Sequence, residues 1–211
     1  MNTAKEILHT GCYAFHIMIH PFDGFWELKY HKKHTFAAAN CILFLVCLMQ
    51  VLIEQFSGYI FNWTEPEDIN LLSTIATYVL PVAAWTIMNW ALSTLFNGKA
   101  TMKQLWVQTC FSLFPLIILL IPWLILSLFL TSDEGAIMNV LNQCAWYWTI
   151  ILLIFGNLTI QDYTMGKTLA MGIFTILGIA AAIFIGIIIF STFQQLVSFL
   201  STVALELKFN S

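Results

Sequence analysis

The sequence contains no arginine: all eight basic residues among its 211 are lysines. Charged residues of either sign make up only 9% of the chain, whereas a soluble domain carries about 25%. Without a guanidinium group, the chain has no bidentate ligand for phosphate or carboxylate groups. The composition excludes nucleic-acid binding, and the shortage of polar side chains excludes a water-soluble fold.

The sequence also lacks the local motifs of common catalytic and metal sites. HExxH, GxSxG and a glycine-rich phosphate loop are absent, and the five cysteines form no CxxC pair. Cys12 precedes the first apolar run, and the other four cysteines lie inside such runs, which is typical of packing residues. We expect a protein that is not an enzyme and holds no metal and no cofactor.

Histidines near the N-terminus leave one alternative open. His16 and His20 are four residues apart, Asp23 is close by, and His31 and His34 follow, so that two or three imidazoles could meet around a divalent metal. Histidines beside lysines and aromatic residues more often contact lipid headgroups, and we favour that interpretation.

Apolar residues dominate the rest of the chain. They make up 60% of it, and the mean hydropathy is +0.84. A helix needs about 20 largely apolar residues to cross a hydrocarbon core about 30 Å thick. The sequence therefore predicts an all-α integral membrane protein with about five transmembrane helices. The expected spans are residues 36–55, 72–96, 105–130, 136–160 and 168–190.

The distribution of lysine predicts how the chain is oriented. Short cytoplasmic loops collect lysine and arginine. Seven of the eight lysines fall in alternate loops: Lys5, Lys29, Lys32, Lys33, Lys99, Lys103 and Lys167. The opposite set has only Lys208 and carries the acidic residues Glu65, Glu67, Asp68, Asp133 and Glu134. We expect the N-terminus inside and the C-terminus outside.

The two ends of the chain differ from the spans. Residues 1–35 mix aromatics, histidines and lysines, which predicts a cytoplasmic interfacial segment before the 36–190 transmembrane domain. Residues 191–211 follow it, with apolar side chains at helical spacing opposite Gln194, Gln195 and Ser198. We interpret this tail as an amphipathic helix on the outer face or as a continuation of the fifth span.

Prolines and charged residues inside the spans are the candidates for a transport path. Pro81, Pro115 and Pro122 are expected to kink their helices, and bends at Pro115 and Pro122 would shape a crevice with the second span. Transport sites usually add charge within the membrane, but Glu54 is the only carboxylate in a predicted span, near its outer end. We interpret Glu54 as an interfacial residue.

Helix packing explains the remaining unusual positions. Uncharged amides within or near the spans are expected to form hydrogen bonds between helices, and they are Asn40, Asn89, Asn139, Asn142, Gln143 and Asn157. Gly178, Ala182 and Gly186 repeat every four residues in the fifth span, a pattern that lets helices approach closely. The partner of this face is either another helix of the chain or another protein.

The segment before the first span is a candidate interface. It reads HPFDGFWELKY and comprises His20, Pro21, Phe22, Asp23, Gly24, Phe25, Trp26, Lys29 and Tyr30. Pro21 is expected to stop a helix that arrives from Ile19, and Asp23-Gly24 is expected to form a turn. We call this segment the elbow. Its aromatic residues either anchor the first span among lipid headgroups or dock a protein partner.

The elbow also carries a family resemblance. Together with Val79-Leu80-Pro81, Asn89-Trp90, Gly98-Lys99 and Leu113-Phe114-Pro115-Leu116, it resembles the bacterial branch of the Yip1-domain membrane protein family. The resemblance covers nearly the whole chain. It implies five spans with the N-terminus inside and the C-terminus outside.

The resemblance also implies a role. Bacterial relatives tend to be encoded beside carbohydrate ABC importers, which implies a multi-pass subunit of the bacterial cytoplasmic membrane that contacts lipid and importer permease subunits but no nucleotide. Eukaryotic relatives act in vesicle traffic, but this chain lacks their long hydrophilic N-terminal region. We therefore expect a non-catalytic accessory or scaffold subunit, with a small transporter or channel and a trafficking adaptor as alternatives.

Overall fold

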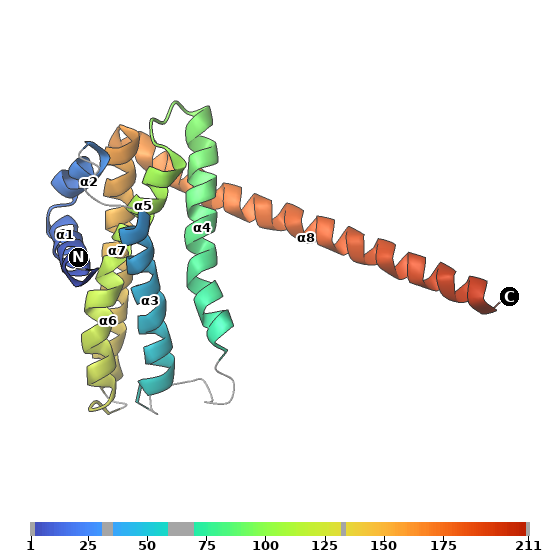
Figure 1. The fold of residues 1–211 in the computed structure, drawn as a ribbon, viewed down its shortest axis with the longest axis horizontal. Helices are drawn as coiled ribbons and strands as arrows, with labels where there is room; N and C mark the ends of the chain where they lie inside the picture. Colours follow the sequence, from blue (N-terminus) through green and yellow to red (C-terminus); the bar gives the residue numbers. More distant parts are fainter. Residues whose placement is uncertain (1–2, 31–35, 59–69, 132–133, 210–211) are drawn as a thin grey trace.

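The computed structural model describes residues 3–30, 36–58, 70–131 and 134–209, and within these ranges the chain is helical and contains no strand (Figure 1). These ranges contain eight helices. They are α1 (Thr3–Ile19), α2 (Pro21–Tyr30), α3 (Phe36–Phe56), α4 (Leu71–Leu95), α5 (Met102–Ser112), α6 (Phe114–Ser127), α7 (Gly135–Gln161) and α8 (Met165–Phe209).

The five spans predicted from hydropathy are confirmed. In the described part of the chain, five helices are long and apolar enough to cross a membrane: Phe36–Phe56, Leu71–Leu95, Met102–Ser127, Gly135–Gln161 and Met165–Thr202. The observed bounds of α3, α4 and α7 lie within one or two residues of the predicted ones. Hydropathy locates these helices well because the thickness of the hydrocarbon core fixes their length.

The third span is divided into two helices. Helix α5 ends at Ser112, α6 begins at Phe114, and Pro115 lies in the first turn of α6. Proline has no N–H to donate and disfavours helical backbone at the residue before it, so a helix that begins at this point tolerates it well. Pro81 and Pro122 lie inside α4 and α6.

The helices form an upright bundle with one long arm (Figure 1). Helix α6 packs mainly on α7 and α3, α5 packs on α7, α3 and α4, and α2 packs on α7. The core between them includes Leu105, Phe111, Leu116, Leu152 and Ile160, all of them fully or almost fully buried. These contacts do not test the crevice expected between α4 and the prolines of the third span, which stays a prediction.

The elbow is a helix bend, and the turn predicted at Asp23-Gly24 is wrong. Helix α1 ends at Ile19, and α2 begins at Pro21 and runs through both residues. Gly24 is needed because α1 passes very close: a Cβ there would lie 2.6 Å from Ile17 Cγ1 and 3.0 Å from Ile17 Cα. Tyr13 Oη donates a 2.7 Å hydrogen bond to the Gly24 carbonyl and fixes the two helices together.

Helix α8 leaves the bundle after its first third. Its first part packs on α4 and α7, where Met171 and Thr175 are buried.

 All residues of α8 from Ala180 to Thr202 are exposed. We call this segment the α8 arm. Helix α8 continues through residue 190 without a break, and the place of the tail on the outer face stays a prediction. Figure 1 shows the arm pointing away from the upright helices.

Candidate functional site

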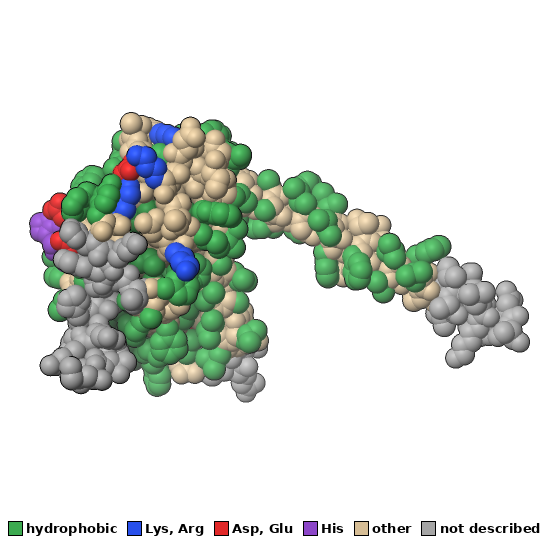
Figure 2. Space-filling model, turned by 45° about the horizontal axis from the view of Figure 1, so that its top comes forward, with side chains coloured by type: hydrophobic (Ala, Val, Ile, Leu, Met, Phe, Trp, Pro, Cys, Tyr) green, Lys and Arg blue, Asp and Glu red, His purple; other side chains and the backbone are tan. Residues whose placement is uncertain are grey.

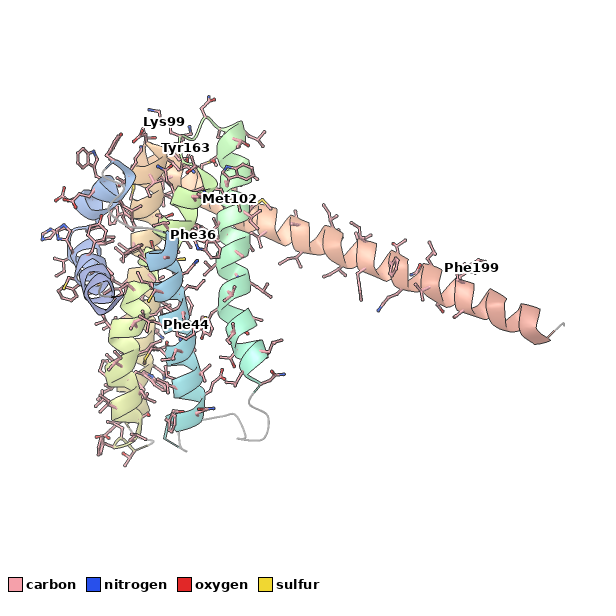
Figure 3. The ribbon with its side chains drawn as sticks, viewed as in Figure 1. Phe36, Phe44, Lys99, Met102, Tyr163 and Phe199 are labelled. Atoms are coloured by element: carbon pink, nitrogen blue, oxygen red, sulfur yellow. The ribbon has the colours of Figure 1, made fainter. Side chains whose placement is uncertain are left out.

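Three segments that are distant in the sequence meet at one end of the bundle. They are the last turn of α2, the connection from α4 to α5, and the connection from α7 to α8. We call their meeting point the polar junction and define it by Lys29, Lys99, Gln161, Asp162, Tyr163 and Lys167. Figure 2 shows lysine side chains gathered at this end of the molecule, and Figure 3 shows Lys99 and Tyr163 there.

A left-handed residue sets the geometry of the polar junction. Asp162 caps the C-terminus of α7 with φ 57° and ψ 40°, and the N–H of Tyr163 donates to the Leu158 carbonyl. Aspartate and asparagine tolerate this backbone conformation better than most residues do. The reversal of the chain at Asp162 lets α8 start directly beside the end of α7.

Asp162 is held by two lysines from different segments. Lys29 Nζ lies 2.6 Å from Asp162 Oδ1, and Lys99 Nζ lies 3.3 Å from Asp162 Oδ2. Lys29 also donates to the Thr159 carbonyl at 3.3 Å, and its side chain is only 10% exposed. The hydrogen bond from Lys29 is the main cause that lowers the pKa of Asp162, and Lys99 adds to it, while desolvation opposes both.

The connection from α4 to α5 packs closely on the end of α7. Gln161 is buried, and its Oε1 accepts a 3.2 Å hydrogen bond from the Ala100 N–H. A Cβ at Gly98 would lie 2.3 Å from Gln161 Oε1 and 2.5 Å from Tyr163 Oη. Only glycine therefore fits at position 98 without a shift of its neighbours.

Lys167 closes the polar junction from the side of α8. Its Nζ donates a 2.6 Å hydrogen bond to the Phe96 carbonyl and lies 4.1 Å from the centroid of the Tyr163 ring. This carbonyl belongs to the residue that caps α4, so the lysine charge also meets the negative end of that helix. Burial raises the pKa of Tyr163, and its phenol therefore stays neutral.

A series of buried amides continues from the polar junction into the bundle. Asn89 Nδ2 on α4 donates a 3.0 Å hydrogen bond to Asn157 Oδ1 on α7. Gln108 on α5 donates to the Leu153 carbonyl at 3.3 Å, where Gly156 leaves room for its side chain. The prediction that Asn89 and Asn157 join helices is confirmed, and Asn40 accepts from Trp106 in the same way. Asn139, Asn142 and Gln143, in contrast, are exposed.

The elbow residues divide into buried and exposed sets. Phe25 is fully buried, so it offers no surface to a partner. Phe22 packs on Phe155 with ring centroids 4.6 Å apart, and Trp26 packs on Tyr30 at 5.0 Å, but Phe22, Trp26 and Tyr30 stay about half exposed. The role of the elbow as a partner interface stays a prediction, and its exposed aromatic residues are the ones available for it.

The three small residues of the fifth span meet different surroundings. A Cβ at Gly178 would lie 2.8 Å from Met88 Sδ on α4, so this residue packs inside the chain. Ala182 and Gly186 belong to the α8 arm, and a Cβ at Gly186 would meet nothing within 4 Å. Any role of this pattern in binding a partner therefore depends on Ala182 and Gly186.

The candidates for transport and metal binding lie away from the polar junction. Glu54 accepts a 2.5 Å hydrogen bond from Thr74 Oγ1 at the opposite end of the bundle. His16 lies in the last turn of α1 and His20 lies between α1 and α2, with their ring centroids 5.5 Å apart. His31 and His34 lie outside the described residues. Among the described residues, no three histidine, cysteine or acidic side chains come together.

Sequence reasoning did not identify Gln161, Asp162 and Tyr163 as site residues. One signal was present: Asp162 is the only carboxylate in the two lysine-rich connections between spans. An isolated carboxylate among lysines indicates an ion pair, although its partner cannot be chosen from the sequence alone. The choice of Lys29 depends on how α2 packs on α7.

The fold and the polar junction define the class of the protein: a multi-pass, all-helical membrane protein whose ion pairs tie together segments at one end of the bundle. The chain matches the family model of the Yip1 domain over residues 15–189. It therefore belongs to the Yip1 family, which is generally a family of non-enzymatic membrane proteins. No curated protein and no solved structure matches the chain.

Proposed function

We propose that this protein is a non-catalytic scaffold subunit of a bacterial cytoplasmic membrane complex and that the α8 arm binds its partner. The observation that carries the proposal is the exposure of the arm. All its residues from Ala180 to Thr202 are exposed, and the part of the arm up to Phe190 carries only apolar side chains and glycine. A helix that is apolar all round belongs in lipid or against another apolar surface.

The length of α8 supports a partner within the membrane. The apolar part of the helix, Met165–Thr202, has 38 residues and is about 57 Å long at ~1.5 Å per residue. A hydrocarbon core about 30 Å thick needs only about half of that length. The helix must then tilt steeply or extend beyond the core, and mismatch of this kind favours association with another helix.

The identity of the partner rests on the family. Permease subunits of a carbohydrate ABC importer are the partner that the resemblance to bacterial Yip1 proteins favours. Transport by the chain alone is less well supported, because Glu54 is the only carboxylate in the described spans and lies at the end of one of them. A trafficking adaptor would require a eukaryotic source.

Co-purification tests the proposal. Tagged protein extracted in mild detergent should carry permease subunits with it. Gly186→Leu on the arm should reduce their recovery, because the bulky side chain keeps helices apart. Ile125→Ala, at an exposed position on α6, is the matched control and should not change recovery. Absence of permeases from the wild-type preparation would refute the proposed partner.

A further inference from the structure

The polar junction has more positive charge than its own carboxylate can neutralise. Lys29, Lys99 and Lys167 contribute three charges, and Asp162 contributes one of opposite sign. The ammonium group of Lys29 has its partners inside the chain, because its side chain is only 10% exposed and contacts both Asp162 and the Thr159 carbonyl. Lys99 is 70% exposed and Lys167 is partly exposed, so their ammonium groups can bind a further anion.

Two buried donors at the polar junction lack a partner. Within the described part of the chain, Gln161 Nε2 and Tyr163 Oη make no hydrogen bond, although both residues are more than nine-tenths buried. Both side chains surround Gly98, next to Lys99. Unpaired buried donors cost about 1–3 kcal/mol each, so an acceptor that reaches them, directly or through water, stabilises the site.

The start of α8 is open at the same place. The amides of α5 are closed by a capping box in which the Gln104 N–H donates to Thr101 Oγ1. The first turn of α8 instead contains Gly166, where a Cβ would meet nothing within 4 Å, beside Lys167. Helix N-termini attract anions because their amides and dipole point toward them.

The geometry points to a phosphate-binding site at the polar junction, formed by Lys99, Lys167 and the start of α8. Phosphate fits because lysine binds it as a point charge without a guanidinium group. Lys99 lies between the spans Leu71–Leu95 and Met102–Ser127, and Lys167 lies in the first turn of the span Met165–Thr202, so both are at the depth of lipid headgroups. The shared chemistry is a phosphate group, carried by an anionic phospholipid or by a soluble phosphate compound.

Lipid retention by the purified full chain tests this site. Native mass spectrometry should show that the wild type retains phosphatidylglycerol in preference to phosphatidylcholine. Lys99→Gln and Lys167→Gln should each weaken this retention about fivefold, since a lysine near a membrane surface contributes about 1 kcal/mol. Lys103→Gln removes the same charge from the exposed first turn of α5 and should change retention less than about twofold.

Further measurements separate the source of the phosphate and the role of folding. Inorganic phosphate that binds lipid-free protein, and binds it less well in Lys99→Gln, supports the site and assigns a soluble source. Lipid retention that inorganic phosphate does not reduce supports the site and assigns a lipid. Lys99 is mostly exposed, so its variant should unfold at the wild-type temperature. Equal loss in Lys103→Gln and Lys99→Gln, or no preference for phosphatidylglycerol, would overturn the inference.

Discussion

Lys29 and Asp162 join the elbow to the end of α7 through a 2.6 Å contact between Nζ and Oδ1. The contact connects a helix that precedes all five spans with the turn between the last two. The elbow is therefore part of the folded bundle, held there by an ion pair whose lysine side chain is 10% exposed and whose aspartate side chain is 35% exposed.

The ion pair should contribute measurably to stability. Asp162→Asn should lower the free energy of unfolding by about 1–3 kcal/mol, because it leaves the largely buried Lys29 ammonium without its charged partner. Asparagine tolerates the left-handed backbone at this position, so the change isolates the charge. Thermal unfolding in detergent micelles measures the effect. Equal stability of the variant and the wild type would show that the pair is unimportant.

The same pair predicts a dependence on pH. The pKa of Asp162 is lower in the folded protein than in the unfolded chain, so its stabilising effect is present above the unfolded value of about 4 and is lost as the pH falls through the folded value. The stability difference between the wild type and Asp162→Asn should be constant near neutral pH and shrink below about pH 4. Unfolding midpoints measured across this range check the sign, and a difference that grows in acid would contradict it.

Gly156 and Gln108 should depend on each other. A Cβ at Gly156 would lie 2.4 Å from Gln108 Nε2 and 2.6 Å from its Cγ, inside the buried amide series. Gly156→Ala should therefore cost about 1–3 kcal/mol of stability, and adding Gln108→Ala should restore part of it.

A matched glycine provides the control for this pair. A Cβ at Gly172 on α8 would meet nothing within 4 Å, so Gly172→Ala should leave stability unchanged or raise it slightly. Thermal unfolding of the wild type and the three variants gives the comparison. Equal unfolding temperatures for Gly156→Ala and Gly172→Ala would contradict the close packing of α5 on α7 at Gly156.

The predicted orientation can be tested with single cysteines in a background without the five native ones. Lys99→Cys lies at the polar junction and Glu134→Cys at the start of α7, and both positions are exposed. A reagent that cannot cross the membrane should label position 134 in intact cells and position 99 only after permeabilisation. The opposite result would reverse the topology.

Hydropathy predicted most of the fold because the bilayer fixes helix length, and the lengths of α3, α4 and α7 left little freedom. It did not predict that α2 passes through Gly24 as a helix. Glycine indicated a turn, but it was required by the close approach of Ile17. Contacts between distant segments leave no local pattern.

The polar junction was harder to predict for the same reason. Lys29 was identified as part of the elbow, whereas Asp162 and Tyr163 were assigned only to a connection between spans. Their importance follows from the left-handed turn at Asp162 and from the packing of Gly98 on Tyr163. The small-residue pattern of the fifth span was visible, but only the structure separates Gly178, which packs on Met88, from Gly186 on the exposed arm.

Photo-crosslinking from the α8 arm tests the central claim most directly. A photoreactive amino acid at Ile187 or Phe193 on the arm, with Leu80 on α4 as an equally exposed control, should be activated in membranes of the native cells. Mass spectrometry of the adducts should identify a permease subunit at Ile187 or Phe193 and only lipid at Leu80. Adducts with lipid alone at all three positions would contradict the proposal that the arm binds a partner protein.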